Sequence, residues 1–123
     1  MKKTILFVDD ELINLFVLEK RFEAEYNVLT AESGEDALKR IEENKETIDA
    51  IISDLKMAEM DGLQLIDRVK PDIVDVPCFL LTGYDYNDQI NAAISSKKVD
   101  FLFKKPFDYN LIDSKLKETL GDG

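Results

Sequence analysis

The stretch that decides the fold is Ile5-Leu6-Phe7-Val8-Asp9-Asp10-Glu11, in which an apolar run ends abruptly in three acidic residues. Three later apolar runs also end in polar residues: 48–53 in Asp54, 79–81 in Thr82-Gly83, and 101–103 in Lys104-Lys105-Pro106. Short, nearly continuous apolar runs are typical of parallel strands that are covered on both faces. In an open α/β sheet, ligands bind beyond the carboxyl ends of the strands. These polar residues are therefore the first candidates for a functional site.

Apolar runs and amphipathic stretches alternate five times along the chain. The predicted strands are Thr4–Val8, Asn27–Ala31, Ala50–Asp54, Cys78–Thr82 and Phe101–Lys104. The predicted helices are Glu11–Glu25, Gly34–Asn44, Gly62–Lys70, Asn87–Ser96 and Asp108–Leu120. Ser33 and Asp108 are expected to cap their helices, and Pro71 is expected to end the third helix. This alternation predicts an α/β fold with a doubly wound parallel sheet.

Helical spacing in the first amphipathic stretch predicts which side chains form its apolar stripe. They are Leu12, Leu15, Phe16, Leu18 and Phe22.

Composition limits the class of protein. The 123 residues predict one domain, residues 1–123. A formal net charge of −10 argues against nucleic acid or an anionic membrane as a direct partner. Cys78 is the one cysteine and lies in an apolar stretch, which predicts a buried, inert thiol in a reducing, cytoplasmic setting. No apolar segment is long enough to span a membrane, and the absence of histidine excludes histidine-based metal sites and bases.

The acidic residues at the strand ends suggest a divalent metal. Asp9 and Asp10 are suited to Mg²⁺ or Mn²⁺, because hard cations prefer carboxylate oxygens and often need only one or two of them. The alternative is an acidic helix start that only stabilises the helix N-terminus. Asp54, at the end of another strand, could join the same metal site. A carboxylate beside a metal can also act as a nucleophile towards phosphorus.

Thr82 and Lys105 would complete a phosphoryl site. The Thr82 hydroxyl can donate a hydrogen bond to a phosphoryl oxygen, while Gly83 leaves room for that group. The Lys105 ammonium can neutralise charge on transferring oxygens. The alternatives are a hydroxyl that closes a turn and a solvated lysine before a strand-ending proline. Each signal is weak alone, but their joint order along the chain is specific.

That order resembles the receiver domain of two-component response regulators, from Ile5 to about Leu120. The resemblance rests on five segments: Leu6–Glu11, Ser53–Met57, Met60–Gly62, Leu81–Gly83 and Lys105–Phe107. It implies a flavodoxin-like (βα)5 three-layer sandwich with a five-stranded parallel sheet of order 2-1-3-4-5. In that order the first and third strands are neighbours, so that Asp9, Asp10 and Asp54 converge.

The resemblance also implies a role for each site residue. Asp54 would be the phosphoacceptor. Asp9 and Asp10 would hold Mg²⁺, with help from Asp54 and the backbone carbonyl of Lys56. Thr82 and Lys105 would contact the phosphoryl group.

Several positions distinguish this sequence from the family pattern or leave a choice open. Ala58 follows Met57 where the family often has proline, which predicts a looser loop. Leu102 occupies the family's aromatic switch position, so the switch is either lost or carried by Phe101 or Phe103. Lys104 and Lys105 are both candidates for the site lysine, and we favour Lys105 because it directly precedes Pro106. The resemblance implies that Lys56 and Tyr84 are positions that tune the lifetime of the phosphoryl group, and a bulky Tyr84 would screen an acyl phosphate from water.

The predicted function is a phosphorylation-activated signalling switch in a His-Asp phosphorelay. The donor would be a sensor histidine kinase or a histidine phosphotransfer protein. An effector domain or a downstream protein would read a changed face formed by Asn87–Ser96, the fifth strand and Asp108–Leu120, which could also form a homodimer. The chain would be no enzyme beyond slow autophosphatase activity.

Three alternatives come from other classes of protein. A degenerate receiver would act only as a docking module, which the intact Asp9, Asp10, Asp54, Thr82 and Lys105 set opposes. A phosphohydrolase of the haloacid-dehalogenase type needs a general-acid aspartate two residues after Asp54, where this chain has Lys56. A flavodoxin-like cofactor module needs Gly, Ser and Thr donors after the first strand, where this chain is acidic.

Overall fold

The fold alternates strands and helices as the sequence predicts. The computed structural model describes residues 2–83 and 88–121. Its strands are β1 (Thr4–Val8), β2 (Asn27–Ala31), β3 (Ile48–Asp54), β4 (Cys78–Thr82) and β5 (Phe101–Lys104). Its helices are α1 (Leu12–Phe22), α2 (Gly34–Asn44), α3 (Gly62–Val69), a 3-10 turn η1 (Lys70–Asp72), α4 (Asp88–Ser95) and α5 (Tyr109–Leu120). Tyr84 and the predicted helix start at Asn87 lie outside the described residues.

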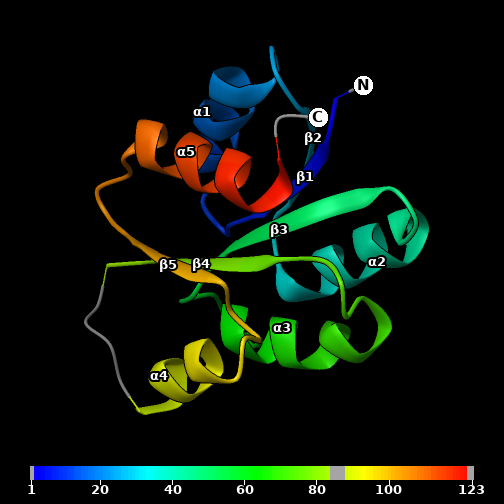
Figure 1. Ribbon diagram of the computed structural model, residues 1–123, viewed down its shortest axis with the longest axis vertical. Coiled ribbons are helices and arrows are strands. Elements are labelled where there is room, and N and C mark those ends of the chain that lie inside the picture. Colours follow the sequence, from blue (N-terminus) through cyan, green and yellow to red (C-terminus); the bar gives the residue numbers. More distant parts are fainter. Residues whose placement is uncertain (1, 84–87, 122–123) are drawn as a thin grey trace.

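All five strands are parallel and form one sheet of order β2-β1-β3-β4-β5. The predicted strand order is therefore confirmed. Figure 1 shows α1 and α5 on one face of the sheet and α2, α3 and α4 on the other. The structure is the predicted three-layer α/β sandwich.

Each face of the sheet has its own hydrophobic core. On the α1/α5 face, Phe7, Phe79 and Phe103 pack with Leu18 and Ile112. On the other face the core contains the side chains Leu6, Ile51, Leu80, Ile66 and Cys78. Burial raises the pKa of the Cys78 thiol to about 11. The predicted buried thiol is confirmed, and it is protonated at neutral pH.

The two residues that were predicted to cap helices, Ser33 and Asp108, both do so in the structure. The Ser33 hydroxyl accepts a hydrogen bond from the Asp36 backbone N–H at 3.0 Å. Asp108 likewise caps α5 by accepting from the Leu111 N–H at 3.1 Å. Pro71 does not continue α3, and the chain passes instead into η1.

Two predictions of strand and helix composition are wrong. β3 begins at Ile48 rather than Ala50, because Ile48 already pairs with Thr4 of β1. The ladder register shifts after this pair, and there the Asp49 carboxylate accepts a hydrogen bond from the Thr4 backbone N–H at 2.8 Å. Leu12 and Phe16 are exposed at 61% and 59% rather than packed in the apolar stripe of α1. The core-facing positions of α1 are Leu15, Leu18 and Phe22. Phe16 follows Leu15 by one residue, so it projects about 100° around the helix.

Gly62 is required where α3 begins, because its backbone passes directly against β3. Its N–H donates to the Leu55 carbonyl at 2.8 Å. A methyl group on Gly62 would collide with the Asp54 carbonyl oxygen and would lie 2.9 Å from Leu80 Cδ2. This close approach fixes the end of β3, which carries Asp54.

We expect Gly62→Ala to lower the free energy of unfolding by about 1–3 kcal/mol, the cost of overpacking a rigid contact. Urea unfolding followed by circular dichroism measures this change. Gly83→Ala is the matched control, because a methyl group there meets nothing within 4 Å. Equal stabilities of the two variants would contradict the steric role of Gly62.

Candidate functional site

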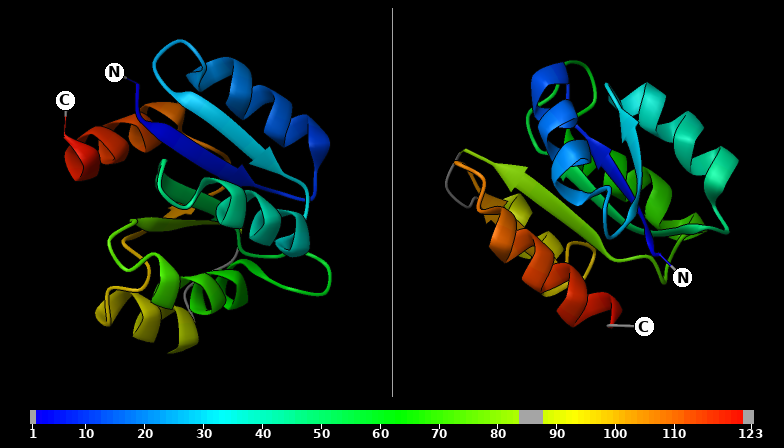
Figure 2. Two further views of the ribbon diagram at one scale, coloured as in Figure 1. Left: turned by 90° about the vertical axis from the view of Figure 1, so that its right-hand side faces the viewer. Right: turned by 90° about the horizontal axis from the view of Figure 1, so that it is seen from above.

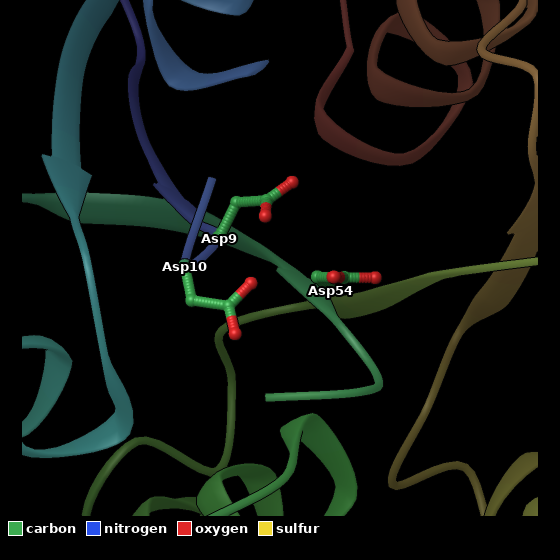
Figure 3. A group of neighbouring side chains, drawn as sticks. All are labelled: Asp9, Asp10 and Asp54. Carbon is green, nitrogen blue, oxygen red and sulfur yellow. The ribbon is translucent and has the colours of Figure 1, made fainter. Parts of the chain in front are cut away.

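The register of β1 against β3 brings the acidic residues together. Val8 lies beside Ser53, so Asp9, Asp10 and Asp54 leave adjacent strands at the same edge of the sheet. One carboxylate oxygen from each of the three residues lies within 4.8 Å of the others. Figure 3 shows the three side chains grouped where β1 and β3 end. The predicted convergence is therefore present.

Asp9 is fully buried and its carboxylate is held by α1. Its Oδ1 accepts a hydrogen bond from the Glu11 backbone N–H at 2.9 Å, and its Oδ2 accepts from Asn14 Nδ2 at 3.1 Å. These donors come from the N-terminal end of the helix, where the dipole also favours a negative charge. The sequence reasoning missed Asn14. The signal was an amide five residues after Asp9, in the first turn of the predicted helix.

Asp54 is 4% exposed and forms an ion pair with Lys105, with 3.2 Å between Oδ1 and Nζ. The pKa of the Asp54 carboxyl is raised to about 6, chiefly by burial and also by the neighbouring Asp9 and Asp10 carboxylates, against the lowering effect of Lys105. The group is therefore largely ionised at neutral pH, but at an electrostatic cost that a bound cation would relieve.

Thr82 and Lys105 enter the site from the next two strands. Thr82 is buried at the end of β4, and its carbonyl accepts a hydrogen bond from the Lys105 N–H at 2.8 Å. The peptide bond between Lys105 and Pro106 is cis. Lys104 is paired in register with Thr82 and its side chain is exposed. Of the two lysines, Lys105 is the one in contact with Asp54.

These side chains surround one open hollow of about 540 Å³. It is lined by Asp10, Glu11, Asp54, Lys56, Thr82, Gly83 and Lys105. Every predicted site residue except Asp9 lines it, and Asp9 lies buried against the other two carboxylates. Carboxylates and an ammonium around an open hollow can bind a divalent cation together with an anionic group.

Ser53, the residue before Asp54 in β3, helps to hold the end of this strand in place. Its buried hydroxyl donates to the Asp54 backbone carbonyl at 2.9 Å. The sequence reasoning did not use Ser53, although a polar residue inside an otherwise apolar buried strand was a usable signal.

The residues around the aromatic switch position face opposite layers. Leu102 is buried in the core beneath α3 and α4, whereas Phe103 belongs to the core beneath α1 and α5 and Phe101 packs against that core. The rings of Phe101 and Phe103 lie 5.0 Å apart, and Lys115 Nζ lies 4.5 Å from the Phe101 ring. Because side chains alternate along a strand, neither phenylalanine takes the place of Leu102.

Comparison with known proteins decides the family. The family model of the response regulator receiver domain matches residues 5–117. The chain belongs to the response regulator receiver domain family. Members of this family are signalling modules of two-component systems that bind Mg²⁺ at a cluster of aspartates, and the carboxylates of Asp9, Asp10 and Asp54 form such a cluster here.

Curated relatives of this receiver domain are longer proteins. The transcriptional regulatory protein GlrR of Escherichia coli K12 is 37% identical over 120 residues, covering 94% of this chain and 26% of that protein. The transcriptional regulatory protein ZraR of Klebsiella oxytoca is 31% identical over 117 residues, with the same coverage. The chain thus spans about a quarter of these relatives.

Solved structures agree in fold. A response regulator receiver domain protein from Clostridium thermocellum superposes with a TM-score of 0.89 at 25% identity, covering 96% of this chain and 94% of that one. The chemotaxis protein CheY4 of Vibrio cholerae has a TM-score of 0.86 at 24% identity, covering 98% and 100%. Within the described part of this receiver domain, no helix is long and apolar enough to cross a membrane.

We expect Asp54→Asn to stabilise the metal-free domain above pH 6, measured by urea unfolding in buffer with EDTA. The pKa of this carboxyl is about 6 in the folded state against 3.8 ordinarily. The folded state therefore binds the proton more tightly, and the wild type loses stability as the pH rises from about 4 to about 6. The gain of the variant should be on the order of 2–3 kcal/mol above this range and vanish below it.

Glu46→Gln is the control for this prediction, because it removes an exposed carboxylate without touching the site. A stability difference between wild type and Asp54→Asn that stays constant from pH 4 to pH 7 would contradict the electrostatic cost assigned to Asp54.

Proposed function

We propose that this domain is a phosphorylation-activated switch in which Asp54 accepts a phosphoryl group from a phosphohistidine donor. The observation that carries the proposal is the Asp54 carboxylate itself. It is buried against two further carboxylates, paired with Lys105 at 3.2 Å, and open to a hollow of about 540 Å³. The family match supports the same function.

Asp9, Asp10 and Asp54 would hold the divalent cation, Mg²⁺ or Mn²⁺, with the backbone carbonyl of Lys56 as a further ligand. The residues fit a hard cation, because three carboxylates lie within reach of one another. The pKa of Asp54 is raised by burial and by the other two carboxylates, so a bound cation would favour its ionised form. When bound, the cation would neutralise these carboxylates and the oxygens of the phosphoryl group.

In the transfer step, one Asp54 oxygen forms a bond to phosphorus while the bond from phosphorus to the donor's imidazole nitrogen breaks. The electron pair of the broken bond leaves with that nitrogen. Lys105 neutralises charge on the transferring oxygens, and the Thr82 hydroxyl donates a hydrogen bond to one of them. Positioning of the reactants accounts for much of the remaining rate.

The signal would pass from the phosphoryl group to the surface through Thr82. Movement of Thr82 towards the phosphoryl group would shift the balance between two conformations of the α4, β5 and α5 face. Leu102, which lies in the same core as residues of α4, would take part in this change with an aliphatic side chain, where the family has an aromatic one. The altered face would contact an effector domain, a downstream protein or a second copy. Slow self-hydrolysis of the acyl phosphate would return the domain to its unphosphorylated state. A donor that is itself phosphorylated by ATP would be cytoplasmic, so the transfer to Asp54 would take place in the cytoplasm.

The proposal predicts a single covalent phosphoryl group on Asp54. Incubation with acetyl phosphate and Mg²⁺ should add one phosphoryl group to the wild type, as measured by intact mass spectrometry. Asp54→Asn should gain none, and EDTA should abolish the gain in the wild type. No adduct on the wild type with acetyl phosphate, together with no transfer from any kinase, would favour the docking-module alternative.

The two lysines at the end of β5 should differ in function. Lys105→Ala is expected to slow phosphorylation by acetyl phosphate roughly a hundredfold, the loss typical of one preorganised charge-stabilising group. Lys104→Ala is the matched control and should react at nearly the wild-type rate, because its side chain is exposed. Tryptophan is absent, so the rates are followed by quenched-flow mass spectrometry. Equal rates of the two variants would refute the assignment of Lys105.

A further inference from the structure

Asp9 is the most deeply buried carboxylate of the Asp9, Asp10 and Asp54 cluster. It is 0% exposed, against 4% for Asp54, whereas Asp10 is exposed. The terminal torsion of an aspartate side chain is soft, because rotation about an sp³–sp² bond has a broad minimum. A buried carboxylate also has little water to orient it, so its neighbours in the protein do so. The orientation of the Asp9 carboxylate is therefore set by its hydrogen-bond donors.

Two donors bind different oxygens of Asp9. The Glu11 backbone N–H donates to Oδ1 at 2.9 Å, and Asn14 Nδ2 donates to Oδ2 at 3.1 Å. The backbone donor alone would let the carboxylate turn about a single contact, whereas a second donor on the other oxygen fixes its plane. An ionised carboxylate has about four lone-pair positions, so others remain for a cation or its bound water. Asn14 is the side chain that determines where these positions point.

The start of α1 brings Asn14 to this contact. Figure 2 shows the chain turning from the end of β1 directly into α1. Glu11 is the N-cap residue and makes no side-chain capping hydrogen bond, and Asn14 is the third residue of the helix. In a capping box, the side chain at this third position accepts from the N-cap N–H. Here the Asp9 carboxylate accepts from that N–H instead, and Asn14 donates to the same carboxylate.

A neutral amide suits this position better than a charged donor. Asn14 Nδ2 carries two hydrogens and lies 3.1 Å from Asp9 Oδ2 and 3.5 Å from Glu11 Oε2. A lysine ammonium in its place would compete with a bound cation, because it would neutralise the same carboxylate. The amide orients Asp9 and leaves its whole negative charge for the cation.

We propose that Asn14 is a positioning residue that sets the affinity of the site for Mg²⁺. It holds Asp9 so that one of its oxygens lies within 4.8 Å of oxygens of Asp10 and Asp54. This inference rests on the proposed function, in which these three carboxylates hold the cation. The open hollow of the site is lined by other residues, so Asn14 acts through Asp9. Loss of its amide would leave the charge of the site unchanged and the orientation of Asp9 loose.

The test measures Mg²⁺ affinity directly rather than through the reaction. Isotope-labelled protein is titrated with Mg²⁺, and NMR chemical shifts give the dissociation constant. Asn14→Ala removes the side chain, and Asn14→Leu keeps much of its volume without the donor. Asn44→Leu is the matched control, because Asn44 is half-buried like Asn14 and its amide donates one hydrogen bond, to the Arg40 carbonyl at 2.8 Å. Asn44 ends α2 just before β3 begins, at the edge of the sheet opposite the site.

We expect both Asn14 variants to bind Mg²⁺ roughly tenfold more weakly, the lower end of the loss typical when a hydrogen-bond partner of a metal ligand is removed. Asn44→Leu should bind Mg²⁺ like the wild type. Phosphorylation by acetyl phosphate gives a second measurement. The Asn14 variants should need roughly tenfold more Mg²⁺ for half of the maximal rate. At saturating Mg²⁺ they should reach the wild-type rate, because Asp54, Thr82 and Lys105 are unchanged.

Urea unfolding in buffer with EDTA separates positioning from a purely structural role. A loss of metal-free stability in the Asn14 variants, together with wild-type affinity for Mg²⁺, would show that Asn14 only supports the start of α1. Rates that stay low at saturating Mg²⁺ would show that Asn14 acts otherwise than through the affinity for the cation. Either result would overturn the proposal.

The remaining outcomes separate the role of Asn14 from the proposed function. Wild-type Mg²⁺ affinity in both Asn14 variants, or an equal loss in Asn44→Leu, would refute the role of Asn14 and leave Asp54 phosphorylation intact. A wild type that neither binds Mg²⁺ nor accepts a phosphoryl group from any donor would refute the proposed function together with the role of Asn14.

Discussion

The repulsion among three carboxylates at one edge of the sheet is the constraint on which the site depends. Parallel pairing of β1 with β3 forces Asp9, Asp10 and Asp54 together. The protein offsets the cost locally: two hydrogen bonds hold Asp9, and Lys105 pairs with Asp54. The compensation is incomplete, since burial and the two neighbouring carboxylates still raise the pKa of Asp54 to about 6. A site that still favours added positive charge is suited to a metal and to a reaction that such a metal assists.

Much of the fold could be predicted from the sequence, because buried parallel strands and amphipathic helices have different patterns of apolar residues. The predicted bounds of β1, β2, β4 and β5 are confirmed to the residue, three of them from nearly continuous apolar runs, and Ser33 and Asp108 marked two helix starts. The strand order came from the family resemblance rather than from the pattern of residues. Once that order is known, the residues just after each strand must gather at one edge, and the candidate site follows from them.

What the sequence could not supply depends on side-chain direction in three dimensions. The apolar stripe predicted for α1 combined residues from two faces of the helix. Leu12 and Phe16 recur at near-helical spacing with the core residues, but their side chains are exposed to solvent. Alternation along β5 separates Leu102 from the two phenylalanines, yet only the packed layers show which side each one faces. Asn14 was missed because its contact with Asp9 depends on how α1 turns away from β1.

The end, the inner face and the outer face of helix α1 have different surroundings. Its N-terminal end holds the Asp9 carboxylate through Glu11 and Asn14, and its inner face packs on the sheet, so the helix cannot shift without disturbing the site. Its outer face carries Phe16, whose side chain is largely in solvent and has no part in holding the carboxylates. Substitutions on the outer face should therefore cost little stability, because they leave both the core packing of α1 and the hydrogen bonds to Asp9 unchanged.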